Sequence, residues 1–155
     1  MRPGLLAFVA AASVAAAPAQ TPPADVADAA AVTAEIAAME REMKPGQGFA
    51  WRPLVKDGER TASIEIWKRP GRPAVHPDQA EYAIVLEGAG TLVSGGTLVS
   101  AKTTRADLVE GDRIEGGTTR KLARGDVLLI SAGVPHWFGV TGGRLVLLGT
   151  KLAVR

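Results

Sequence analysis

Cysteine is absent from this sequence of 155 residues, so the fold needs no disulfide framework and no lipid anchor can be attached through a cysteine. A large excess of charge is absent too, because 18 basic and 16 acidic residues leave a net charge of +2. These charges are scattered, and no basic stripe follows the chain that would track a phosphate backbone. We therefore expect no nucleic-acid partner. The length and the 46% of hydrophobic residues fit one globular domain.

A hydrophobic run long enough to span a bilayer as a helix is also missing. The apolar run over 5–17 follows Arg2 and leads to Ala-Pro-Ala at 17–19, the small-x-small pattern of a secretory cleavage site. The pattern predicts a signal peptide over 1–19 and a periplasmic or secreted mature protein that begins near Gln20, with no stable membrane span. A retained N-terminal anchor is the alternative interpretation.

Residues 20–48 are predicted to form a flexible lead and one short helix. The lead is rich in Pro, Ala and Asp, and the helix begins at Thr33 as its N-cap and ends at Lys-Pro-Gly, 44–46. The apolar side chains of one helix face are spaced to pack on the main domain or on a second subunit, and we expect a homodimer. These side chains are Ile36, Met39 and Met43.

From residue 49 to 155 the pattern is that of short strands joined by short turns. A Gly-Gly pair at 95–96, between two copies of Thr-Leu-Val-Ser, predicts a tight hairpin. Even spacing of strands without intervening helices predicts an all-β fold, an antiparallel barrel or jelly roll. Outside the Thr-Leu-Val-Ser repeat, strands are expected over 49–55, 61–67, 81–86, 118–122, 127–130, 136–140 and 145–152.

Histidine is scarce, and both histidines of the chain stand beside strands. His76 precedes Glu81 by five positions, and His136 follows a Gly-Val-Pro turn. If the two strands pair, two imidazoles and one carboxylate meet. This is the donor set of a site with two histidines and one carboxylate, which suits Fe²⁺, Mn²⁺, Ni²⁺ or Zn²⁺ and leaves open positions for a small molecule. A lumen that lacks a metal, with both imidazoles merely hydrogen-bonded, is the alternative.

The two segments resemble the signature motifs of the cupin superfamily, small β-barrels whose lumen usually holds a metal ion. In the first motif, Glu81 and Gly88 have the family's interval and His76 stands at the second histidine position, while Ala74 occupies the first. In the second motif, Gly125, Gly133 and His136 match, while Ser131 replaces the proline and Val140 the asparagine. The resemblance covers about 49–152. It implies a small single-domain cupin with a metal held by His76, Glu81 and His136.

Strand alternation predicts which side chains accompany these three residues in the lumen. Phe138 and Val140 share the face of His136, and Ala83 and Val85 share that of Glu81. The lumen is therefore expected to be mostly apolar around three polar groups, as pockets for small molecules usually are.

Further polar and aromatic side chains remain open to two interpretations. Aromatic residues can line the rim of the lumen or pack in the core, and the arginines before His76 can attract a carboxylate or remain solvated. Asp78 is either a further oxygen ligand or the cap of a turn, and Tyr82 and Glu87 are the candidate general bases. The aromatic candidates are Trp51, Trp67, Tyr82 and Trp137, and the arginines are Arg69 and Arg72.

Two functions follow from this interpretation. The first is an exported, metal-dependent enzyme that acts on a small organic molecule in the lumen, with dioxygenase, lyase or isomerase chemistry all compatible. The second is a non-catalytic module that binds a small ligand in the same lumen. The substrate and the reaction are not encoded in these motifs.

Overall fold

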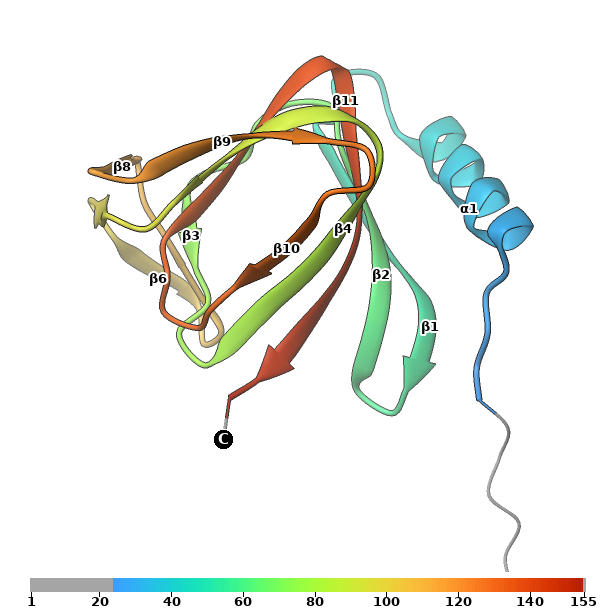
Figure 1. Ribbon diagram of the computed structural model, residues 1–155, viewed down its shortest axis with the longest axis horizontal. Helices are drawn as coiled ribbons and strands as arrows, with labels where there is room; N and C mark the ends of the chain where they lie inside the picture. Colours follow the sequence, from blue (N-terminus) through green and yellow to red (C-terminus); the bar gives the residue numbers. More distant parts are fainter. Residues whose placement is uncertain (1–23, 155) are drawn as a thin grey trace, which may run out of the picture.

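A computed structural model describes residues 24–154, which form one helix, a curled nine-stranded antiparallel sheet and a small two-stranded sheet (Figure 1). The helix is α1 (Ala29–Glu42), and the strands are β1 (Phe49–Asp57), β2 (Arg60–Trp67), β3 (Ala74–Val75), β4 (Gln79–Ser94), β5 (Thr97–Val99), β6 (Lys102–Arg105), β7 (Leu108–Glu110), β8 (Arg113–Glu115), β9 (Thr118–Ala123), β10 (Val127–Ile130) and β11 (His136–Ala153).

Two long strands, β4 and β11, form the central ribbon of the sheet. They pair antiparallel from His136 opposite Ser94 to Ala153 opposite Gln79. At one end β11 also pairs with β2, which pairs with β1, and β4 pairs with β10. At the other end β11 pairs with β3 and β4 pairs with β9. The ribbon therefore connects both ends of the fold, and the all-β, jelly-roll prediction is confirmed.

The inner face of the curled sheet carries the main core. Its buried side chains come from β4, β9, β10 and β11, and Trp67 of β2 packs against them. The alternation predicted for β4 and β11 holds, because Ala83, Val85 and Phe138 all lie in this core. The other buried members are Leu92, Leu122, Ile130, Leu145 and Leu147.

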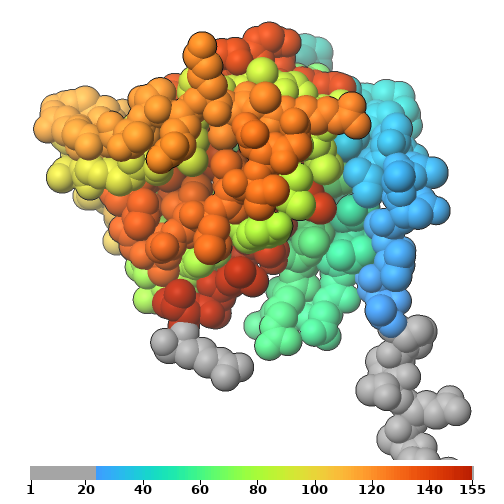
Figure 2. Space-filling model, viewed as in Figure 1, coloured from blue at the N-terminus to red at the C-terminus, as the bar shows by residue number. Residues whose placement is uncertain are grey.

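The helix packs on the outer face of the sheet, where Figure 2 shows it against the barrel wall. Ile36 and Met39 are buried there against Ile64 and Ile66 of β2 and Val146 of β11. The apolar face of the helix is thus occupied within the chain. This face therefore gives no argument for a second subunit, and the homodimer stays a prediction.

The start of the helix differs from the prediction. Asp28 is the N-cap, because its side-chain oxygen accepts the N–H of Ala31 at 2.8 Å. Thr33 lies one turn inside, where its hydroxyl donates to the carbonyl of Ala29. Alanine has the highest helix propensity, so Ala29–Ala31 extend the helix back to the preceding acidic cap.

Two predicted strand breaks are wrong. The strand predicted over 81–86 continues through Gly88 and Gly90 to Ser94, and the turn predicted at 141–143 is an irregularity inside β11. The pairing register of β11 against β4 shifts between Thr141 and Leu145. Such a bulge bends a long strand without ending it, which lets one strand serve both ends of the sheet.

The hairpin predicted at the Gly-Gly pair is also wrong. Both glycines adopt positive φ, as expected, but β5 pairs with β8 and not with the end of β4. The segment from Thr91 to Ser94 already pairs with β9 on one side and β11 on the other. It therefore has no free edge for the second copy of the repeat.

The strands predicted over 49–55 and 61–67 are confirmed and pair as the hairpin of β1 and β2, and β10 has the predicted bounds. The predicted signal peptide over 1–19 lies outside the described residues. Within the described part of the chain, Asp25 accepts the backbone N–H of Lys56 in β1 at 3.0 Å. The single helix there is too short and too polar to cross a membrane.

Candidate metal centre

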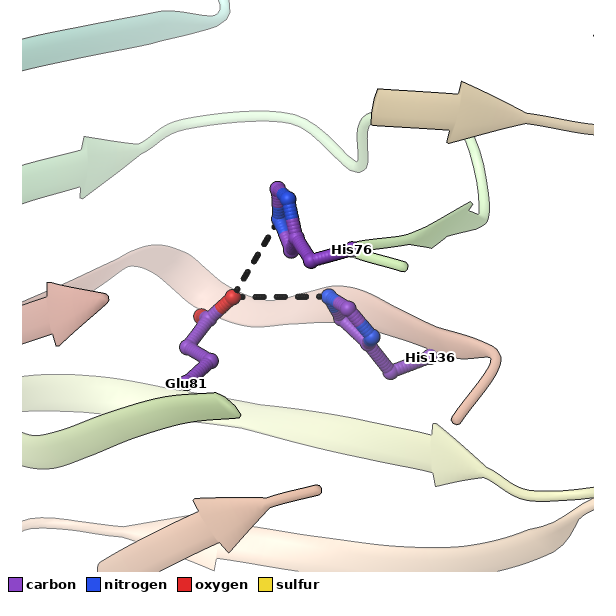
Figure 3. A group of neighbouring side chains, drawn as sticks. All are labelled: His76, Glu81 and His136. Carbon is purple, nitrogen blue, oxygen red and sulfur yellow. Dashed lines mark ion pairs between the residues drawn. The ribbon is translucent and has the colours of Figure 1, made fainter. Parts of the chain in front are cut away.

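The three predicted ligands meet inside the barrel although they come from three places in the chain. His76 follows β3, Glu81 lies near the start of β4, and His136 is the first residue of β11. Figure 3 shows the two imidazoles pointing at the carboxylate of Glu81. The distances from Oε2 of Glu81 are 3.6 Å to Nε2 of His76 and 3.4 Å to Nε2 of His136. One donor atom from each residue lies within 4.8 Å of the others.

Backbone carbonyls fix the orientation of both imidazoles. Nδ1 of His76 lies 2.9 Å from the carbonyl oxygen of Asp107, and Nδ1 of His136 lies 3.0 Å from that of Val134. A carbonyl only accepts, so each Nδ1 carries a proton, and Nε2 is the nitrogen of each ring that faces Glu81 and could bind a metal. This arrangement, in which the second nitrogen is held by the backbone, is typical of histidines that bind metals.

All three side chains are buried, with 8%, 4% and 5% of the surface of His76, Glu81 and His136 exposed. Burial and the charge of Lys151 lower the pKa of His76, which favours the neutral form that binds metals. Two imidazoles and one carboxylate whose donor atoms converge fit a divalent cation. The residues present therefore suit the metal that the motifs imply.

A fourth polar residue, Lys151 of β11, reaches the same carboxylate. Its ammonium donates to Oε2 of Glu81, the oxygen that faces both imidazoles. Burial raises the pKa of Glu81, but the hydrogen bond from His136 and the charge of Lys151 outweigh that effect and bring the pKa to about 2. Glu81 is thus a carboxylate at any pH near neutrality.

A second carboxyl group, Glu65 of β2, lies on the lumen side beside this cluster. The indole N–H of Trp67 donates to its Oε2 at 3.0 Å. Burial, with the negative charge of Glu81 next, raises the pKa of Glu65 to about 7. At neutral pH this group is therefore poised between its protonated and ionised forms, and it is the titratable group of the lumen best placed to exchange a proton.

Replacing Glu65 by Gln is expected to change the pH dependence of stability. Because the folded-state pKa of about 7 lies above the unfolded value of 4.5, the contribution of Glu65 is fully present below pH 4.5 and lost as pH rises through 7. Gln is neutral throughout. In chelator, the stability of Glu65→Gln relative to the parent should therefore increase by up to about 3 kcal/mol between pH 5 and 8. Urea unfolding of parent and variant at pH 5 and pH 8 measures the two free energies of unfolding. The same difference between variant and parent at both pH values would contradict the prediction.

A cavity of about 650 Å³ opens onto the three ligands. Its apolar lining includes Trp67, Trp137 and Phe138, and its charged lining includes Arg72 and Lys151. Trp67 also packs in the core, at 6.0 Å between its ring centroid and that of Phe138. The cavity thus combines aromatic walls with more charged groups than the sequence predicted, and it suits a small organic molecule that carries polar or charged groups.

The motif position that lacks a histidine lies in this cavity. Ala74 pairs directly with His136 in the sheet and lines the cavity. Its methyl side chain offers no donor atom, so three candidate ligands stand where the family pattern has four. Asp78, the alternative oxygen ligand, is exposed at the turn before β4.

The other sequence candidates fall outside the cluster. Tyr82 is 36% exposed on the face of β4 opposite Glu81, and Glu87 pairs with Arg144 beside the helix. Neither is therefore placed to act as a base in the lumen. Arg72 pairs with Asp112 at 2.7 Å, although it also lines the cavity. Arg69 is exposed.

Sequence reasoning missed Glu65 and Lys151 as members of this site. The signal was present in part, because Glu65 alternates with Ser63 and Trp67 on one face of β2. Lys151 likewise alternates with Leu145 and Leu147, so all three share one face of β11. Which face is the inner one depends on pairing with strands far away in the sequence, and the local pattern does not reveal it.

Comparisons with known proteins support the fold. No family model and no curated protein matches the sequence. Among solved structures, hydroquinone 1,2-dioxygenase PnpCD in complex with Cd²⁺ and 4-hydroxybenzonitrile is similar with a TM-score of 0.51 and 16% identity, over 66% of this chain and 63% of that one. KdgF from Halomonas sp. has a TM-score of 0.50 and 16% identity, over 73% and 87%.

The cupin domain of Cnp3 from Schizosaccharomyces pombe is similar with a TM-score of 0.50 and 12% identity, over 70% of this chain and 63% of that one. The match thus spans less than two thirds of the dioxygenase chain and of the Cnp3 domain. Together with the curled antiparallel sheet and the buried His-Glu-His group, these similarities establish that the chain has the fold of the cupin superfamily.

Proposed function

We propose that this protein binds one divalent metal ion through His76, Glu81 and His136 and acts as a metal-dependent enzyme on a small organic molecule. The observation that supports the proposal is the convergence of two carbonyl-anchored imidazoles on one buried carboxylate. Fe²⁺, Mn²⁺, Ni²⁺ and Zn²⁺ all accept such ligands. Acidic clusters without function are common on protein surfaces. This site differs from them because all three side chains are buried.

A bound metal supplies Lewis-acid chemistry or activation of a small oxidant at its open positions. The residues of the chain provide the rest. The carbonyls of Asp107 and Val134 hold the imidazoles in place, the aromatic lining excludes water, and Glu65 exchanges a proton at its carboxyl group near neutral pH. Dioxygenase, lyase and isomerase reactions are all compatible with these parts.

A second function, a metal-free module that binds a small ligand, is favoured by one observation. The ammonium of Lys151 already neutralises Glu81, and Ala74 removes one donor from the family pattern. A carboxylate that is already paired with an ammonium does not need a cation to offset its charge. The cavity would then bind its ligand by shape and by its aromatic lining.

Elemental analysis of protein purified without a metal-affinity tag tests the choice. About one equivalent of a transition metal per chain, lost in chelator together with turnover of a panel of small organic molecules, is the expected result. Protein that contains no stoichiometric metal and takes none up on dialysis would contradict the enzyme proposal and leave the binding module. A metal-loaded protein that binds members of the panel without turnover would likewise contradict catalysis.

A further inference from the structure

We propose that Lys151 and the metal ion compete for Glu81, and that metal binding frees the Lys151 ammonium to bind an anionic group of the ligand. This inference rests on the proposed metal site and extends it to the chemical class of the ligand. It starts from a contact that the cupin motifs do not contain, the ion pair between the last strand and the Glu81 carboxylate.

The competition follows from which oxygen is shared. Oε2 of Glu81 is the atom nearest to both imidazoles, at 3.6 Å and 3.4 Å from the Nε2 atoms of His76 and His136. A metal with bonds of about 2.0–2.2 Å to all three residues must lie between these atoms and bind that oxygen. The ammonium of Lys151 donates to the same oxygen. A divalent cation placed there meets a neighbouring positive charge, so the two cations disfavour each other.

The side chain of Lys151 has room to leave. Its side chain is 33% exposed, compared with 6% for its partner Glu81. It lines the cavity that holds the His-Glu-His group and also a wider cleft, which Glu81, Glu65 and Gln79 line as well. A flexible stem of four carbons therefore moves the ammonium off the carboxylate without disturbing the strand.

The freed ammonium selects the ligand. With a metal at the site, Glu81 is neutralised by the metal, and the cavity gains a cation close to the open coordination positions. The arginines of the same cavity are already engaged, Arg105 with Asp107 at 3.2 Å and Arg72 with Asp112 at 2.7 Å. Lys151 is thus the cation of that lining whose ion-pair partner the metal takes over, and Glu65 is the carboxyl group of the same lining with which a ligand anion competes for it. A carboxylate or similar anion on a planar organic body fits this charge and the aromatic walls.

The first test is Zn²⁺ titration of the parent, Lys151→Met and Lys151→Arg by calorimetry. Zn²⁺ serves as the probe because it binds imidazole and carboxylate ligands well. We expect Lys151→Met to bind Zn²⁺ about tenfold or more tightly than the parent, since one repulsive charge is removed, and Lys151→Arg to stay close to the parent. Lys121→Met, which removes an exposed lysine of β9, is the matched control and should leave the affinity unchanged.

Thermal melting separates competition from simple damage. Without metal, Lys151→Met should melt below the parent, because Glu81 loses its partner, whereas the increase in melting temperature on adding Zn²⁺ should be larger in the variant. A variant that binds Zn²⁺ as the parent does or more weakly would overturn the competition while leaving the proposed metal site intact. If neither protein binds Zn²⁺, both proposals fail. If Lys151→Met binds Zn²⁺ and the parent does not, the ammonium of Lys151 excludes the metal completely, and the competition is supported.

The second test compares benzoate with benzamide, which have the same shape but differ in charge. The Zn²⁺-loaded parent should bind benzoate about tenfold more tightly than benzamide, and Lys151→Met should lose that preference. If Lys151→Met keeps the preference for benzoate, the anion binds the metal and not the lysine. That result would overturn the assignment of Lys151 as the anion-binding group.

Discussion

Replacing His136 by alanine is expected to remove most of the bound metal. Only His76 and Glu81 would then remain as protein ligands, and Ala74, which lies opposite residue 136, has no donor atom to substitute. The metal content of purified His136→Ala should therefore fall from about one equivalent to near zero. A mutant that retains stoichiometric metal would contradict the assignment of this histidine.

The same substitution is expected to reduce stability in two ways. A metal present at 100 times its dissociation constant adds about 2.7 kcal/mol to the free energy of unfolding, and His136→Ala loses that contribution. Loss of the hydrogen bond and of the packing of the buried ring costs a further amount on the order of 1 to 3 kcal/mol. This second cost is expected with and without metal. Melting curves of parent and variant, with and without chelator, separate the two effects.

Asp78→Ala is the matched control for the ligand set. Asp78 is an exposed acidic residue three positions before Glu81, and its backbone carbonyl accepts the N–H of Val154 at 3.0 Å. Removal of its side chain should leave metal content and the chelator effect unchanged. Loss of metal in Asp78→Ala would show that the cation binds at the turn and not in the lumen.

Gly88→Ala is expected to prevent folding or to cost more than about 3 kcal/mol. Gly88 has φ +75°, and a Cβ placed there would lie 2.0 Å from the carbonyl oxygen of Arg144. That carbonyl belongs to the irregular part of β11, where the strand bends across β4. Neither backbone can yield without loss of the pairing that holds both ends of the sheet together. Urea or thermal unfolding of the variant measures the effect.

Gly142→Ala provides the comparison that separates a steric clash from backbone strain. Gly142 also has a positive φ, +69°, but no atom of the described residues lies within 4 Å of the place that an alanine methyl group would take. Its replacement should cost only about 1 to 2 kcal/mol, the penalty of a left-handed conformation for a residue with a Cβ. Equal effects of Gly88→Ala and Gly142→Ala would show that close approach of Arg144 is unimportant.

The fold and the convergence of His76, Glu81 and His136 were predictable from local patterns taken together with the resemblance to the cupin motifs. Alternation along 81–85 and 136–140 assigned the lumen face, and the motif spacing brought His76, Glu81 and His136 together. The glycine seven positions after Glu81 was recognised as a motif residue, and its close contact with Arg144 explains why the position requires glycine.

What the sequence did not predict depends on contacts between distant strands. The repeat at 91–100 looked like a hairpin because a local pattern does not show that β4 is already paired on both sides. Lys151 lies 70 residues from Glu81, and its role follows only from the antiparallel register of β11 and β4, which places the two opposite each other. Asp28 displaced Thr33 as the cap because the alanines between them extend the helix.

Binding of one metal ion by His76, Glu81 and His136 can be seen in a crystal of the Zn²⁺-loaded protein, measured at the zinc absorption edge. We expect one anomalous peak about 2.0–2.2 Å from Nε2 of each histidine and from a Glu81 oxygen, with the Lys151 ammonium moved off that oxygen. Zinc bound elsewhere, with the Lys151–Glu81 ion pair intact and no peak between the two imidazoles, would contradict it.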